Sequence, residues 1–290
     1  MTDLKSNIKK AIQNSGYPLE QRVGRFLTKQ GWHPFHSVNY TDPISGKERE
    51  LDILAYKLIN ERRIELRISC KRSASKPWIF FTEDSSRYRI MTDTLKRTPV
   101  RESKDKEILE LLGDLRFFKH ERRAMNFTTL SEKDFNNEAR ALVKDGIYSS
   151  INSVHHRIFP RELLFDERGT IYFFITLFDG NMFESYYDEK DDDDIVNEIE
   201  YTQYQVKYPL VYDRNQTIPD ESGRLVPLGN VMYWFSEWFN VEIVKWSIFG
   251  NYLKEIENAF GKLNEDQIQT FGKSWKQENF PKLVGKAPKI

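Results

Sequence analysis

Two short runs decide the fold, RELDILA at residues 49–55 and RISCKRS at residues 67–73. Both have the length and the β-branched or apolar content of strands, and their polar and apolar side chains alternate. The polar segment at residues 60–63 suits a hairpin loop between them. We therefore expect two adjacent strands, with a carboxylate, Asp52, on the first and an ammonium group, Lys71, on the second.

Alternation of side chains along a strand assigns these residues to two faces of the sheet. One consistent register gathers polar groups of both strands on a single face: Glu50, Asp52, Ser69 and Lys71. The opposite face then packs into the core, where Cys70 is expected to behave as a small buried hydrophobe. The simpler alternative is that the polar face is an ordinary solvated sheet surface.

Such a polar cluster meets the needs of phosphodiester hydrolysis. Carboxylate oxygens bind Mg²⁺, which prefers octahedral oxygen coordination and keeps several waters. A bound metal lowers the pKa of one of these waters and stabilises negative charge on the phosphate. Lys71 would orient that water or neutralise the developing charge. We expect Asp52 to be the first metal ligand, with Mn²⁺ as a substitute for Mg²⁺.

The pattern extends upstream to a helix that carries Glu20. Several short segments between this helix and Asp52 belong to the pattern. In chain order they are Gly16–Glu20, Gly31-Trp32, Ser37–Tyr40, Asp42-Pro43, Gly46-Lys47 and Arg49–Leu51. With the Ser69-Cys70-Lys71 triplet, this order resembles the N-terminal half of a nuclease core of the PD-(D/E)XK, or restriction-endonuclease-like, superfamily. In that family a helix glutamate, a strand aspartate and an acid-X-lysine triplet build the site.

The resemblance implies catalytic roles for Glu20, Asp52, Ser69 and Lys71, and metal ligation by Asp52 and Glu20. Glu50 is a further candidate metal ligand because it shares the face of Asp52. Ser69 departs from the family pattern, since a serine brings no negative charge to the position of the usual acid. Three outcomes stay open: Glu50 or Glu65 supplies the missing carboxylate, Glu20 and Asp52 suffice, or the site is inactive.

The resulting hypothesis is a Mg²⁺-dependent endonuclease that hydrolyses phosphodiester bonds of DNA. The alternative is a catalytically impaired or inactive nuclease-fold protein that binds nucleic acid or serves as an assembly subunit. A third alternative is a structural protein without any role in nucleic-acid binding. DNA is the expected partner, and a homodimer is compatible with the sequence.

Charge is segregated along the chain although the totals balance, with 44 basic and 44 acidic residues. A basic excess, which phosphate contacts would require, extends from residue 71 to residue 123. Acidic residues concentrate at 186–194. The basic side chains nearest to the candidate site are predicted to bind nucleic acid: Arg72, Lys76, Arg87 and Arg89. Any one of them could instead be an ordinary exposed helical residue.

The chain is expected to be an α/β (α+β) protein with a mixed central sheet flanked by helices. A restriction-endonuclease-like core would span residues 1–180, with an insertion at about 82–130. Residues 181–290 would form a C-terminal extension that packs on or extends the core sheet.

The predicted elements of the core follow from local signals. A helix begins near Pro18 and closes at Gly31. A long helix runs from about Ser131 through Ile151, although Gly146 weakens the prediction that it is unbroken. The apolar run 171–178 is predicted to pair with 182–186 through a turn at Asp179-Gly180.

Composition excludes several classes of protein. No run of 18 or more apolar residues is present, and the beginning of the sequence is too polar for a secretory signal, so no membrane partner is expected. A single cysteine allows no internal disulfide and fits a reducing cytoplasm. The sequence has no Walker loop, no dinucleotide glycine fingerprint and no Gly-X-Ser-X-Gly elbow.

Overall fold

The computed structural model of the chain describes residues 2–14, 17–42, 45–60, 62–73, 76–84, 122–130, 137–158, 171–207, 217–219, 225–227 and 238–262. The helices of this part are α1 (Thr2–Asn14), α2 (Tyr17–Lys29), α5 (Asn137–Ile158), the short 3₁₀ helix η1 (Trp246–Ile248) and α7 (Phe249–Lys262). The strands are β1 (His33–Thr41), β2 (Glu48–Ile59), β3 (Arg62–Arg72), β4 (Trp78–Asp84), β5 (Arg122–Thr129), β6 (Ile171–Asp179), β7 (Met182–Asp188), β8 (Asp193–Ile199), β9 (Tyr201–Lys207), β10 (Thr217–Pro219), β11 (Leu225–Pro227) and β12 (Trp238–Lys245).

One mixed, 10-stranded sheet organises the molecule, in the order β1-β2-β3-β6-β12-β9-β5-β4-β7-β8. The strands β1, β2 and β3 form an antiparallel meander, and β6 then runs parallel to both β3 and β12. Strands β10 and β11 form a separate hairpin. The expectation of a mixed α/β protein with a central sheet is therefore confirmed.

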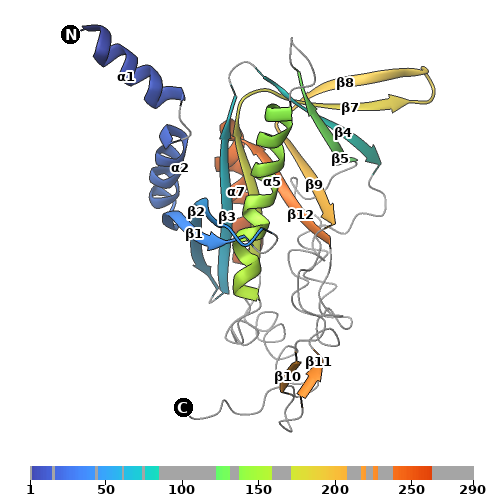
Figure 1. Cartoon of the computed structure of the whole chain (residues 1–290). Coiled ribbons are helices and arrows are strands. Elements are labelled where there is room, and N and C mark those ends of the chain that lie inside the picture. The colour runs from blue at the N-terminus through green and yellow to red at the C-terminus, as the bar shows by residue number, and fades with distance from the viewer. Residues whose placement is uncertain are drawn as a thin grey trace.

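Helices cover both faces of the sheet, as Figure 1 shows. On one face, α2 and α7 enclose a first core cluster with apolar residues of β2, β3 and β6. On the other face, α5 encloses a second core cluster with residues of β4, β6 and β12. Strands β3 and β6 are thus buried on both sides, which is typical of parallel strands between helical layers.

Helix α2 forms where the sequence predicts it. Pro18 occupies the first turn, where its missing N–H is not needed, and Leu19, Val23 and Leu27 form the buried stripe. Gly31 follows the helix with a φ of +78°, a left-handed conformation that favours glycine. Because Glu20 lies in the first turn of this helix, α2 presents it at one end of the sheet.

The polar face of β3 is buried, so it is not an ordinary solvated sheet surface. Glu65, Arg67 and Ser69 are each only 1% exposed, because α5 packs over them. The guanidinium of Arg67 bonds to the Glu65 carboxylate and donates to the backbone carbonyl of Ser153 on α5, at 2.8 Å. The prediction for Cys70 is confirmed, since its side chain lies buried in the first core cluster.

Helix α5 continues unbroken through Gly146. A Cβ at this position would lie 2.9 Å from Cγ2 of Thr176 and 3.1 Å from Cγ of Lys71. Glycine is therefore what allows the helix to approach β3 and β6 so closely. The expected helix start at residues 131–136 lies outside the described residues.

The predicted hairpin between residues 171–178 and 182–186 is wrong. Strand β6 pairs with β3 and β12, whereas β7 pairs with β4 and β8. Gly180 follows β6 and lies against the chain just after β3, since an added Cβ would be 2.5 Å from the Ser73 carbonyl oxygen. The chain therefore leaves β6 at a close backbone approach instead of folding back on itself.

The segment expected as an insertion begins and ends in two antiparallel strands of the sheet, β4 and β5. Residues 85–121, which carry most of the basic excess, lie outside the described residues. Strands that come after residue 180, namely β7, β8, β9 and β12, belong to the same sheet as β1–β3.

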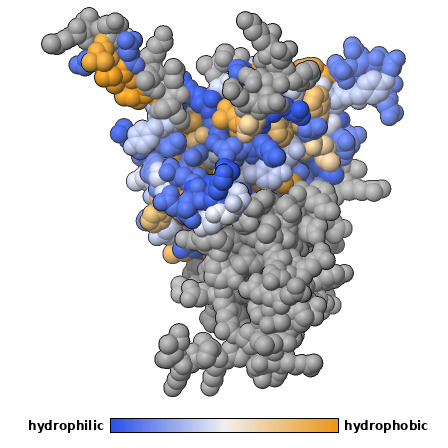
Figure 2. Space-filling model, viewed as in Figure 1, coloured by the Kyte–Doolittle hydropathy of each residue, from blue (hydrophilic) through white to orange (hydrophobic). Residues whose placement is uncertain are grey.

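Helix α1 exposes apolar side chains at four-residue spacing, Leu4, Ile8 and Ile12. Figure 2 shows this apolar stripe on α1, beside a largely hydrophilic surface over the neighbouring elements. Among the helices in the described part of the chain, none combines the length and the apolar character that crossing a membrane requires.

Candidate active site

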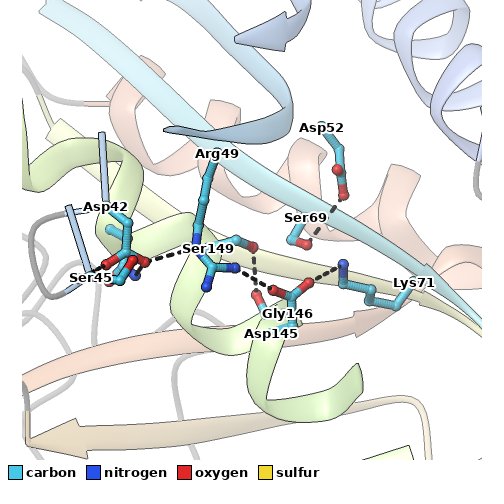
Figure 3. A network of polar contacts seen from close by, with 10 residues as sticks. Asp42, Ser45, Arg49, Asp52, Ser69, Lys71, Asp145, Gly146 and Ser149 are labelled. Carbon is cyan, nitrogen blue, oxygen red and sulfur yellow. Dashed lines mark hydrogen bonds and ion pairs between the residues drawn. The ribbon is translucent and has the colours of Figure 1, made fainter. Parts of the chain in front are cut away.

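Asp52 lies on β2 just where this strand separates from β3. The backbone ladder between the two strands ends at the pair Ile53 and Ile68, so Asp52 is the first residue beyond it. Its carboxylate accepts the backbone N–H of Cys70 at 2.5 Å. It also accepts the hydroxyl of Ser69 at 3.2 Å, a contact that Figure 3 shows. Beyond the last backbone pair, the side chain of Asp52 therefore accepts a backbone N–H of β3, that of Cys70.

Lys71 follows on the same strand and reaches toward α5. Its ammonium Nζ lies 2.8 Å from Oδ2 of Asp145, in the middle of that helix. The Lys71 side chain is only 13% exposed, since its stem passes along Gly146. Figure 3 shows the two pairs side by side, with Asp52 and Ser69 next to Lys71 and Asp145.

Glu20 joins this group from α2. Partial burial, together with the charges of Asp52 and Glu50, raises the pKa of Glu20 to about 7 against the opposing effect of Lys71. Burial also raises the pKa of Asp52, which Lys71, the Cys70 N–H and the Ser69 hydroxyl lower in turn. Burial, which disfavours the charged carboxylate, is the largest cause of both shifts.

Two other carboxylates were candidates for the acid that Ser69 does not supply. Glu50 is exposed, and its charge is felt by Glu20. Glu65 lies in the core, where it bonds to Arg63 at 3.0 Å and to Arg67, both on its own strand. Its carboxylate is therefore engaged by two guanidinium groups away from Lys71, so Glu65 does not take the place of the missing acid.

Of the four basic residues predicted to bind nucleic acid, the structure describes two. Arg72 lies at the end of β3, with Nε 3.5 Å from the Asp179 carboxylate, which also pairs with Arg22 at 2.8 Å. Lys76 follows β3, and its backbone N–H donates to the Ser73 hydroxyl. The other two, Arg87 and Arg89, lie outside the described residues.

Sequence reasoning missed the contribution of α5. Asp145 pairs with Lys71 and also with Arg49, whose Nη1 lies 3.5 Å from its Oδ1. Arg49 in turn contacts Asp42 at 3.0 Å, and Asp42 accepts the side-chain amide of Asn152 at 2.9 Å. A signal was present, because Asp145, Ser149 and Asn152 are spaced by four and three residues and so share one helix face.

Whether these residues fit a divalent cation can be judged from the carboxylates. Among the described residues, no group of three or more His, Cys, Asp or Glu side chains is placed to bind a metal ion. Mg²⁺ does not require such a group, because it commonly takes one or two carboxylates and keeps its waters. Asp52 and Glu20 offer two carboxylates, and Asp52 is near enough to Glu20 for its charge to raise the pKa of Glu20.

Comparisons of the chain with protein-family models, curated proteins and solved structures give no significant match. The functional assignment therefore rests on the sequence motifs, the fold and the arrangement of these residues. They define a mixed α/β protein with an acidic and a basic group side by side at one end of its central sheet.

Proposed function

We propose that this chain is a Mg²⁺-dependent nuclease of the PD-(D/E)XK type that hydrolyses phosphodiester bonds of DNA. The observation that carries the proposal is the placement of Asp52 against the Ser69-Cys70-Lys71 triplet. The Asp52 carboxylate bonds to Ser69 and Cys70, and Lys71 is close enough to lower its pKa. An acidic oxygen and an ammonium group thus lie together where two strands separate.

The order of elements supports the same proposal. From α2 the chain passes through β1, β2 and β3, then through β4 and β5, to α5 and to β6, which runs parallel to β3. With β4 and β5 set aside as the two ends of an insertion, the order helix, three strands, helix and strand is also the common core order of the family that the motifs resemble. Element order alone is shared by proteins of different function, so the site residues must carry the assignment.

Each side chain has a definable role in this proposal. Asp52 and Glu20 would bind Mg²⁺, which when bound supplies an acidic water and charge neutralisation at the phosphate. The Ser69 hydroxyl and the Cys70 N–H orient the Asp52 carboxylate. Asp145 positions the Lys71 ammonium, from which Lys71 can donate a hydrogen bond to an anionic phosphate oxygen.

A second candidate is a nuclease-fold protein without activity, which binds nucleic acid or acts as an assembly subunit. Ser69 favours it, because a hydroxyl replaces a charged metal ligand and weakens the affinity for a hard cation. The pairing of Lys71 with Asp145 also favours it, since this lysine is already neutralised by a residue of α5.

Cleavage of plasmid and oligonucleotide DNA separates the two candidates. We expect cleavage by the full chain in Mg²⁺ or Mn²⁺, and a loss of about 10²–10³-fold in Asp52→Asn and in Lys71→Met, the loss typical of one deleted electrostatic contact. Matched controls are Asp84→Asn and Lys254→Met, which alter exposed residues outside the site. Ser69→Glu restores the acid of the family pattern and should increase cleavage at low Mg²⁺ concentration.

The outcomes assign the function. DNA binding without cleavage by the wild-type chain and by Ser69→Glu, in both metals, would favour the non-catalytic candidate. No binding to DNA at low salt would exclude the nuclease and the DNA-binding form of the second candidate, and would leave only the assembly subunit. Cleavage that survives in Asp52→Asn would show that another site or a contaminating enzyme is responsible.

A further inference from the structure

A cavity of about 520 Å³ lies beside the candidate site, between α5 and the strands β1 and β2. Its walls include Tyr40, Arg49, Asp145 and Tyr148. Asp145 belongs to this cavity and also pairs with Lys71 at 2.8 Å, so the two regions share a wall. A volume of this size is in the range of small-molecule sites, about 300–1,000 Å³.

The charges in the wall of the cavity compensate one another. Arg49 contacts both Asp42 and Asp145, at 3.0 and 3.5 Å, and Lys71 contacts Asp145 from outside. Asp42 also accepts the Asn152 amide and the backbone N–H of Ser45. A free phosphate would meet two carboxylates, and a divalent cation would have to displace the paired arginine, so a neutral polar group suits the cavity best.

Aromatic and hydroxyl groups complete the lining. The half-buried ring of Tyr148 forms part of the wall, with the ammonium of Lys144 5.7 Å from its centroid. Tyr40 is 2% exposed, and its hydroxyl finds no hydrogen-bond partner among the described residues. Burial raises the pKa of Tyr40, so its hydroxyl remains a donor. A buried hydroxyl without a partner is unfavourable, and a ligand with an acceptor group would satisfy it.

We propose that this cavity receives one unpaired nucleotide of the DNA strand that is cut, with its base against Tyr148 and its polar edge near Tyr40 and Asn152. A nucleobase is neutral, planar and carries both donors and acceptors, which matches the wall. Lys144 would then lie near the sugar-phosphate backbone. The inference rests on the proposed nuclease function and names its substrate class as single-stranded DNA or DNA with an extrahelical nucleotide.

The preference for an unpaired base has a simple energetic reason. A base inside a duplex must lose its stacking and pairing before it can enter a cavity, and this costs free energy. A single strand or an extrahelical nucleotide avoids most of this cost. The full chain should therefore bind both of these more tightly than a fully paired duplex of the same sequence.

The test is fluorescence anisotropy with labelled oligonucleotides in Ca²⁺, used to slow cleavage. A series of single strands carries one abasic nucleotide, moved along the sequence relative to the cleavage position. We expect one abasic position to weaken binding by about 5- to 100-fold, the range for a lost base–aromatic stack. The Tyr148→Ala variant should bind the intact strand as weakly as the wild type binds the strand with that abasic position. Introducing the abasic nucleotide should not weaken binding by the variant any further.

Matched variants keep the result interpretable. Tyr148→Phe retains the ring and should bind like the wild type, and Tyr187→Ala removes an exposed tyrosine of the β7–β8 hairpin without effect. Should Tyr148→Ala fail to fold, Tyr40→Phe tests the same cavity through one hydroxyl. It should weaken binding of the intact strand several-fold and leave the abasic strand unchanged.

The failure of this inference differs from the failure of the nuclease proposal. Equal binding of intact and abasic strands at every position, with cleavage that still depends on Asp52, would overturn the cavity assignment and leave the nuclease. Tighter binding of paired duplex than of single strand would also overturn it. The absence of any DNA binding or cleavage would remove the nuclease proposal, and the cavity assignment with it.

Discussion

At the scale of single residues, Glu242 has the most unusual environment outside the candidate site. It lies on β12 and is 1% exposed, between the Tyr201 hydroxyl and the Gln203 amide, which both donate hydrogen bonds to it. Burial raises the pKa of Glu242 to about 7, although these two hydrogen bonds favour the charged form. The ionised carboxylate is therefore a source of instability at neutral pH and above.

Replacement of Glu242 by glutamine should change how stability depends on pH. The pKa is about 7 in the folded chain and 4.5 in the reference state, so this group stabilises the fold fully below pH 4.5 and loses that contribution as the pH rises through 7. The loss is about 3 kcal/mol for a shift of this size. Glu242→Gln should remove this part of the decline and leave the part that comes from the raised pKa of Glu20, measured by urea unfolding at intervals between pH 5 and pH 8.

An exposed carboxylate provides the comparison for this variant. Asp84 is 81% exposed and pairs with Arg122, so Asp84→Asn is the control for replacing an acid by its amide at the surface. A decline of equal steepness in Glu242→Gln and in the wild type would show that Glu242 does not titrate in this range.

The candidate site itself was only partly accessible from the sequence. Asp52, Ser69 and Lys71 could be grouped, because a period of two assigns their faces and a short hairpin sets their register. Asp145 could not be grouped with Lys71, since 74 residues separate them and only the packing of α5 brings them together. The engagement of Glu65 by Arg67 was hidden for the same reason, because it depends on burial under α5.

At the scale of elements, α5 is the helix on which the site depends most. Its Gly146 faces the buried Thr176 of β6, and an added Cβ would lie 2.9 Å from that side chain. Overpacking of a well-packed contact costs about 1–3 kcal/mol. Gly146→Ala should therefore lower the free energy of unfolding by about this amount, measured by urea unfolding, even though alanine favours helices.

A second helical glycine, Gly261, provides the control that distinguishes the effect of packing from that of helix propensity. Gly261 in α7 would have no neighbour within 4 Å of an added Cβ, so Gly261→Ala should be neutral or stabilising, by up to about 1 kcal/mol. If both variants stabilised the chain equally, the close approach of α5 to the sheet would be contradicted.

The elements were easier to predict than their partners. The start of α2 at Pro18 and the meander from β1 to β3 follow from caps, alternation and a short loop. The pairing of β6 does not, because a strand that is apolar on both faces can pair with any neighbour. The Asp179-Gly180 dipeptide favoured a hairpin, but β6 instead joins β3 and β12 in parallel.

At the scale of the whole molecule, the sheet combines strands from distant parts of the chain. Strand β12 runs parallel to β6 with Val244 beside Leu177, and α7 contributes Tyr252, Leu253 and Ile256 to the first core cluster. Residues 1–180 and 181–290 thus share one core, although the motifs that suggest a nuclease lie only in the first part.

This shared core predicts that residues 1–180 do not fold alone. Without β12 and α7, strand β6 loses its parallel partner on one side and the first core cluster loses one of its two helices. The fragment should give no cooperative transition in urea and should bind a hydrophobic dye, whereas co-expression with residues 181–290 should restore a cooperative transition at a denaturant midpoint near that of the intact chain. Cooperative unfolding of residues 1–180 alone, with native-like near-ultraviolet circular dichroism, would contradict the prediction and make the first part an independent domain.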